Sequence, residues 1–117
     1  MKTEQMPEVA WQTYRAATEA VRSGHLSKAS KILRQAILEA DATGKVEPLL
    51  ISSAHSLAEK YYGEGDYLGA AALFRTILES RRRSLGEEHP EVSDSRKRLE
   101  MALWQYGGIT PRLLNAE

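Results

Sequence analysis

The chain contains no cysteine, and this absence removes several kinds of chemistry at once. Disulfides, thiolate nucleophiles and the common structural zinc sites are excluded. Long apolar runs are also missing, since nowhere do about 18 apolar residues follow one another as a membrane span requires. The first residues, MKTEQMPEVAWQ, lack the apolar core of a signal peptide. We therefore expect a cytoplasmic protein that does not enter a membrane.

An excess of charge of either sign is absent as well, because sixteen basic residues balance sixteen acidic ones. Without a net field, the chain as a whole is not drawn toward nucleic acid or an anionic membrane. Valine, isoleucine and threonine are sparse, whereas alanine, leucine, glutamate and arginine abound, and this composition favours helices over strands. Since 117 residues suit one domain, we expect a single all-α domain over residues 1–117.

An internal repeat organises this sequence, and it is marked by residues that recur at a constant offset. After the second unit the offset grows by one residue, so that GKVEP returns as GEEHP. Proline is favoured in the first helical turn, and the recurring prolines therefore predict three helix starts. Five pairs are 41 residues apart: Pro7 and Pro48, Ala17 and Ala58, Gly24 and Gly65, Ala29 and Ala70, and Leu33 and Phe74.

Apolar residues within each unit follow one face of a helix. Ala10, Tyr14, Ala17 and Val21 step by 4, 3 and 4, and similar steps recur three more times before the third proline. This spacing predicts two helical hairpins, at about 7–44 and 48–86, followed by a helix at about 90–106 and a tail over 107–117. Glycines between the paired helices are expected to adopt positive φ and turn the chain back.

These spaced residues resemble the tetratricopeptide repeat. The period, with SLGEEHPEVSDS between hairpins, is similar to that of the 42-residue repeat type of kinesin light chain-like proteins. The resemblance implies a short right-handed α-solenoid of two helix-turn-helix hairpins plus a C-terminal capping helix. The positions that carry it are Ala17, Gly24, Ala29, Leu33 and Ala36 in the first unit, and Ala58, Gly65, Ala70, Phe74 and Ile77 in the second.

The third helix departs from the repeat at two positions. Arg96 and Glu100 stand where the second unit has Ala54 and Ala58. A charged side chain is costly to bury without a partner. We therefore predict that this helix ends the stack and presents a polar outer side, as terminal repeats do.

The resemblance also implies a binding site, because the first helix of each such hairpin lines a concave groove that holds a peptide or a helix. We thus predict a non-catalytic scaffold that binds a partner protein and needs no cofactor or metal. Aromatic and arginine side chains suit this role, since they carry much of the energy of many interfaces. The matching positions are Trp11, Tyr14, Arg15, Thr18, Ser52, His55, Ser56, Glu59, Tyr62, Lys97, Arg98 and Met101.

Two alternatives to peptide binding stay open. The basic clusters Arg81–Arg83 and Arg96–Arg98 have the charge to contact phosphates, so a nucleic-acid-binding helical array is the second hypothesis. Acidic residues separate the clusters, which favours a self-paired surface and makes nucleic acid a less expected partner. His55 and Glu59 lie four residues apart on one helix face and could share a proton or a metal ion, which is a third, minor hypothesis. Two ligands do not by themselves make a metal site.

The tail after the third helix raises the question of self-association. Two hairpins make a short array, and at least three repeats are usually needed to bury a continuous core. Ile109, Leu113 and Leu114 in the tail are suited to cover exposed apolar surface, either on their own chain or on a second copy. A homodimer formed through the C-terminal tail is therefore a further prediction.

Overall fold

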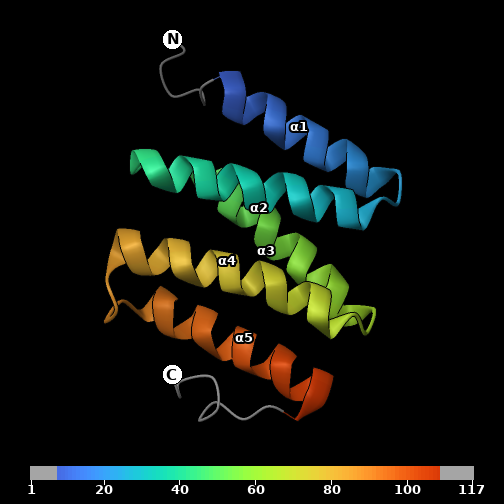
Figure 1. The fold of residues 1–117 in the computed structure, drawn as a ribbon, viewed down its shortest axis with the longest axis vertical. Helices are drawn as coiled ribbons and strands as arrows, with labels where there is room; N and C mark the ends of the chain where they lie inside the picture. The colour runs from blue at the N-terminus through green and yellow to red at the C-terminus, as the bar shows by residue number, and fades with distance from the viewer. Residues whose placement is uncertain (1–7, 109–117) are drawn as a thin grey trace.

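A computed structural model describes residues 8–108, and every regular element of this range is an α-helix (Figure 1). The predicted tail residues Ile109, Leu113 and Leu114 lie outside the described residues, so the homodimer stays a prediction. The helices are α1 (Glu8–Arg22), α2 (Leu26–Thr43), α3 (Pro48–Gly63), α4 (Tyr67–Leu85) and α5 (Pro90–Gly107).

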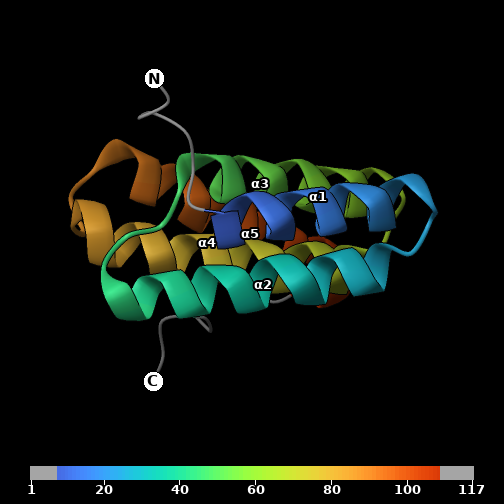
Figure 2. The ribbon, with the colours of Figure 1, turned by 90° about the horizontal axis from the view of Figure 1, so that it is seen from above.

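The helices pack in consecutive pairs, as the all-α prediction required. α1 lies against α2, α3 lies against α4, and α5 packs on α4. Seen from above, α1 and α3 occupy one side of the stack while α2 and α4 occupy the other (Figure 2). The predicted short helical solenoid of two hairpins and a fifth helix is confirmed.

Glycine makes the turn inside each hairpin. Gly24 and Gly65 have φ of +82° and +84°, a conformation that other residues rarely adopt, and the prediction for both is confirmed. After the second turn, the Asp66 side chain accepts a hydrogen bond of 2.9 Å from the backbone N–H of Gly69 and so begins α4. A Cβ at Gly69 would lie 3.0 Å from Cδ1 of Tyr61. The absence of a side chain therefore lets α4 approach α3 closely.

The connector between α4 and α5 is held by a histidine. Nδ1 of His89 accepts a hydrogen bond of 3.1 Å from the backbone N–H of Glu91, and Pro90 follows in the first turn of α5. Proline is well suited there because the first N–H groups of a helix have no partner within the helix. His89 thus caps the N-terminus of α5.

Alanine and leucine fill the core between the two layers. Ala29, Ala58 and Ala70, which the repeat had singled out, are fully buried, and so is Ile37. Small side chains let helices lie close together, while burial of each large one favours folding by about 1.5–3 kcal/mol. A polar link also crosses the stack: Asp41 of α2 accepts a 3.1 Å hydrogen bond from the buried hydroxyl of Ser80 on α4.

The outer side of α5 is less polar than the sequence had indicated. The inner face of this helix buries Val92 and Leu99 against the stack. Arg96 and Glu100 lie partly exposed, as predicted, but Met101 and Trp104 are 55% and 56% exposed. The expectation of a polar outer face failed because helical spacing places these two apolar residues beside the charged ones.

Candidate functional site

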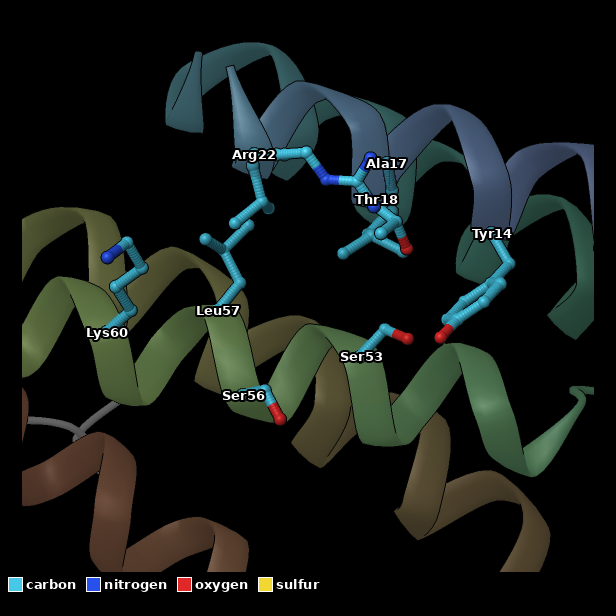
Figure 3. Close-up of a pocket in the computed structure, with 10 residues that line it drawn as sticks. Tyr14, Ala17, Thr18, Arg22, Ser53, Ser56, Leu57 and Lys60 are labelled. Carbon is cyan, nitrogen blue, oxygen red and sulfur yellow. The ribbon is translucent and has the colours of Figure 1, made fainter. Parts of the chain in front are cut away.

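A hollow of about 390 Å³ separates α1 from α3 (Figure 3). Its floor is apolar, formed by the buried side chains of Ala17, Leu33 and Leu57. This hollow, which we call the first basin, is open to solvent on the side away from α2. Its lining comprises Tyr14, Ala17, Thr18, Val21, Arg22, Leu33, Ser53, Ser56, Leu57 and Lys60.

Polar groups surround the apolar floor of the first basin. Hydroxyls of Thr18 on α1 and of Ser53 and Ser56 on α3 line its walls (Figure 3). Arg22 and Lys60 supply positive charge. Arg22 also lies 3.5 Å from Glu19 on its own helix, and Lys60 lies 3.4 Å from Glu64, the residue after α3. A basin with an apolar floor and hydroxyls at its walls can hold an apolar side chain and bond the backbone beside it.

A second basin, of about 760 Å³, lies between α3, the end of α4 and the start of α5. Charged residues dominate it. Nε of Arg98 lies 3.2 Å from a carboxylate oxygen of Asp94, and the same guanidinium donates to Glu59 across the interface of α5 with α3. Arg81 of α4 donates a 2.8 Å hydrogen bond to Ser95 and lies 3.6 Å from Glu91. These ion pairs hold α5 in place.

His55 sits at the wall of this second basin. Its ring meets the edge of Phe74 at a centroid distance of 5.8 Å, and its Nδ1 lies 3.9 Å from Oε2 of Glu59. Burial and the nearby Arg98 charge lower the pKa of His55, although Glu59 acts in the opposite direction. His55 is thus held toward its neutral form. Glu59 is engaged by Arg98, so the pair lacks a carboxylate reserved for proton transfer.

Two smaller hollows continue along α3 and α5. One, of about 90 Å³, lies between Glu59, Tyr62, Phe74, Arg98 and Met101. The other, of about 430 Å³, lies over the end of α5. We call the residues that line it the α5 patch: Tyr62, Lys97, Glu100, Met101, Trp104 and Gln105.

Most of the predicted groove residues come together along this face, but not in one pocket. Tyr14, Thr18 and Ser56 line the first basin, and Ser56 is shared with the second. Ser52, His55 and Arg98 line the second basin, whereas Glu59, Tyr62, Lys97 and Met101 line the two smaller hollows.

Two predicted groove residues on α1 lie beside these hollows. Trp11 is 42% exposed and stacks on Tyr14, with ring centroids 5.5 Å apart. Arg15 is exposed and lines none of the four hollows. The stacked pair extends the first basin with an aromatic surface along α1.

Sequence reasoning missed several lining residues. Arg22 follows Thr18 by four residues, and Lys60 follows Ser56 by four, so helical spacing would have placed them on the groove face. Ser53 lies three residues before Ser56 on that face. Arg81 gave no such signal, because it reaches the second basin from the far end of α4.

The two basic clusters are engaged with carboxylates of the same chain. Glu87 joins them, since it accepts from Arg82 and, at 3.0 Å, from Arg96. These two guanidinium groups lower the pKa of the Glu87 carboxyl. Arg83 lies 3.3 Å from Asp41. This pairing favours the self-paired surface, and nucleic-acid binding stays a prediction without a contact that supports it.

None of the helices between residues 8 and 108 is long and apolar enough to cross a membrane. Within the same residues, no three side chains of histidine, aspartate or glutamate are grouped as a metal site would need.

Stacked helical hairpins that leave one face of first helices open define an α-solenoid, a class of protein built from repeats. The sequence model described as tetratricopeptide repeat matches residues 50–91, which span α3, α4 and the start of α5. This part of the chain carries a tetratricopeptide repeat, and the match is consistent with the kinesin light chain-like type. No curated protein matches the chain. Tetratricopeptide repeats generally mediate protein–protein interactions and are generally non-catalytic.

Proposed function

We propose that this chain is a non-catalytic scaffold that binds one segment of a partner protein, an extended peptide or a helix, along the face of α1, α3 and α5. The first basin carries the proposal, because it joins an apolar floor to hydroxyl-bearing walls on two helices. Such a site fits an apolar side chain and offers hydrogen bonds to the backbone that bears it.

In this proposal, different groove residues make different kinds of contact with the partner. Trp11 and Tyr14, stacked on each other, provide rigid aromatic surface at little entropic cost. Thr18 on α1 and Ser56 on α3 both line the basin, and their hydroxyls bond the partner backbone. Charged groups of the second basin then set orientation, because electrostatic complementarity mainly fixes register and speeds association.

The single domain over residues 1–117 belongs to the same proposal, with repeats at about 7–44 and 48–86 and a capping helix at about 90–106. We place this scaffold in the cytoplasm, where the absence of cysteine suits a reducing environment. Partner binding is its whole activity, without a catalytic step or a cofactor.

Blocking the first basin tests the proposal. Thr18→Arg and Ser56→Arg place a long side chain over the floor without removing a core contact, since neither residue is fully buried. Gln35→Arg, on the exposed outer side of α2, is the matched control. Partners captured by the wild-type chain from its native extract are identified, purified and titrated against all four proteins.

The expected result is a loss of affinity of at least tenfold for both basin variants and an unchanged affinity for the control. Circular dichroism and urea unfolding of each variant establish that it is folded. Equal affinities for all four proteins would show that the partner binds elsewhere and would overturn the groove assignment.

A further inference from the structure

The α5 patch leaves large apolar side chains exposed at the C-terminal end of the described stack. Met101 and Trp104 are each more than half exposed, and they border a hollow of about 430 Å³ together with Tyr62. Large apolar side chains grouped around a hollow mark a place where another segment binds. The question is which segment covers this patch.

The second hairpin shows how the same position is covered one repeat earlier. Tyr62 stands in α3 where Trp104 stands in α5, one period later in the sequence. Tyr67, the first residue of α4, meets the Tyr62 ring edge-on at a centroid distance of 5.1 Å. Tyr67 comes five positions after Tyr62, and Ile109 comes five positions after Trp104. In the repeat, Ile109 thus corresponds by sequence position to Tyr67.

The backbone after α5 leaves the helix in the same conformation as the turns within the hairpins. Gly108 caps α5 with a left-handed φ of +71°, and Gly65 in the second hairpin has φ of +84°, one position earlier in the repeat. We propose that residues 109–117 of the same chain dock on the α5 patch, so that they take the place of the second helix of a third hairpin.

Charge complementarity supports this assignment. Within the second hairpin, the facing helices hold two fully buried alanines, Ala58 and Ala70. One period later these positions are Glu100, which lines the α5 patch, and Arg112 in the tail. The two alanines of the second hairpin are thus replaced, one period later, by an acidic and a basic residue that can form an ion pair. Ile109, Leu113 and Leu114 supply the apolar groups that the hollow would take.

The reach of the segment favours its own chain over a second copy. Nine residues span at most about 30 Å when extended, while α5, with 18 residues, is about 27 Å long. The segment begins directly after Gly108, beside the patch. Docking within one chain therefore costs only the ordering of the segment, whereas exchange with a second chain also costs freedom of translation and rotation.

Fluorescence of Trp104 tests the proposal in the full chain. Trp11→Phe leaves Trp104 as the only indole, since the chain has two tryptophans. If the segment covers Trp104, its emission lies to the blue of an exposed indole and resists quenching by acrylamide. Leu113→Ser with Leu114→Ser should shift the emission to the red and increase quenching, whereas the neighbouring change Asn115→Ser should leave both unchanged.

Charge reversal separates docking from a general effect of the tail. Glu100→Arg and Arg112→Glu should each increase quenching of Trp104, and the two changes together should restore the protected state. Circular dichroism controls for the fold, which these surface changes leave intact. Independence of the emission from protein concentration, with a monomer by light scattering, is expected for docking within one chain.

Three results would overturn the proposal. A Trp104 emission maximum typical of an exposed indole in the full chain, and unchanged by the tail variants, would show that the patch is uncovered. Protection that appears only with rising concentration, together with a dimer, would assign the patch to a second copy. Protection that appears only on adding a purified partner would assign it to that partner.

Discussion

The two halves of the groove face are built from the same repeat but are held together by different forces. Between α1 and α3, the first basin has a floor of alanine and leucine, and the charged residues at its rim pair with carboxylates three or four positions away in the sequence. Between α3 and α5, arginines pair with carboxylates across helices. One half thus offers apolar surface to a partner, whereas the other uses its charges to fasten the last helix.

This difference teaches that a repeat constrains the backbone more strongly than the chemistry of its face. Apolar burial is not screened by salt and involves no titrating group, whereas half-exposed ion pairs are screened by salt and lose strength as their groups titrate. The halves should therefore respond differently to mutation and solvent conditions.

The largest effect is expected in the apolar half. Leu33→Ala removes a side chain that is 1% exposed beneath the first basin, and it should lower the free energy of unfolding by about 3 kcal/mol. Urea denaturation measures this change, and it should be the same at low and high salt. Leu38→Ala, on the exposed side of α2, is the control and should change stability by less than about 0.5 kcal/mol. Similar losses for both variants would contradict a core role for Leu33.

A polar link that joins the hairpins comes next. Asp41 accepts from the buried Ser80 hydroxyl and lies 3.3 Å from Arg83, so Asp41→Ala leaves both groups without this partner. A loss of about 2 kcal/mol is expected, since an unsatisfied buried hydroxyl costs about 1–3 kcal/mol. Asp41→Asn keeps an acceptor for Ser80 and should lose less. If the two variants are equally stable in urea, the hydrogen bond contributes nothing measurable.

The ion-paired half should respond to a smaller degree. Arg98→Met removes the guanidinium that joins α5 to Glu59 while keeping the length of the side chain. We expect a loss of about 1 kcal/mol or less, because the pair is partly exposed. The loss should shrink when the salt concentration is raised, in contrast to that of Leu33→Ala. A loss that is independent of salt would show that packing, rather than charge, holds this interface.

The smallest effect concerns pH and His55. Burial and Arg98 lower the pKa of His55 in the folded state below the ordinary value of 6.5. At pH values between the folded and the unfolded pKa, the unfolded chain therefore binds more protons than the folded chain. The stability contributed by neutral His55 is therefore complete above about pH 6.5 and is lost as pH falls toward the folded pKa. His55→Gln should flatten this part of the stability–pH curve. An unchanged curve would show that His55 does not couple to folding.

Several features of the fold could be predicted from the sequence because they depend on neighbours along the chain. Gly65 and Pro90 were placed correctly at a turn and at a helix start, since φ and the missing N–H are properties of the residue itself. Helical periodicity also showed which alanines are buried. The outer side of α5 was misjudged because Glu100 was weighed without Trp104.

The candidate site was less predictable, because its walls come from different helices. Ser56 and Thr18 were found by analogy with the repeat, whereas Arg22 and Lys60 were not, although spacing alone would have added them. Arg81 could not be placed, since its contact with Ser95 depends on the angle at which α5 crosses α4.

The sequence by itself determined the period, the helices, the glycine turns and the pairing of helices into hairpins, because these follow from local conformational preference and apolar spacing. Tertiary structure alone decided which charges meet across helices. Arg98 engages Glu59, so His55 and Glu59 do not form a free pair. Tertiary structure also divided the open face into separate basins. The physical reason is that long charged side chains choose partners by distance in space, which depends on the packing of helices far apart in the chain.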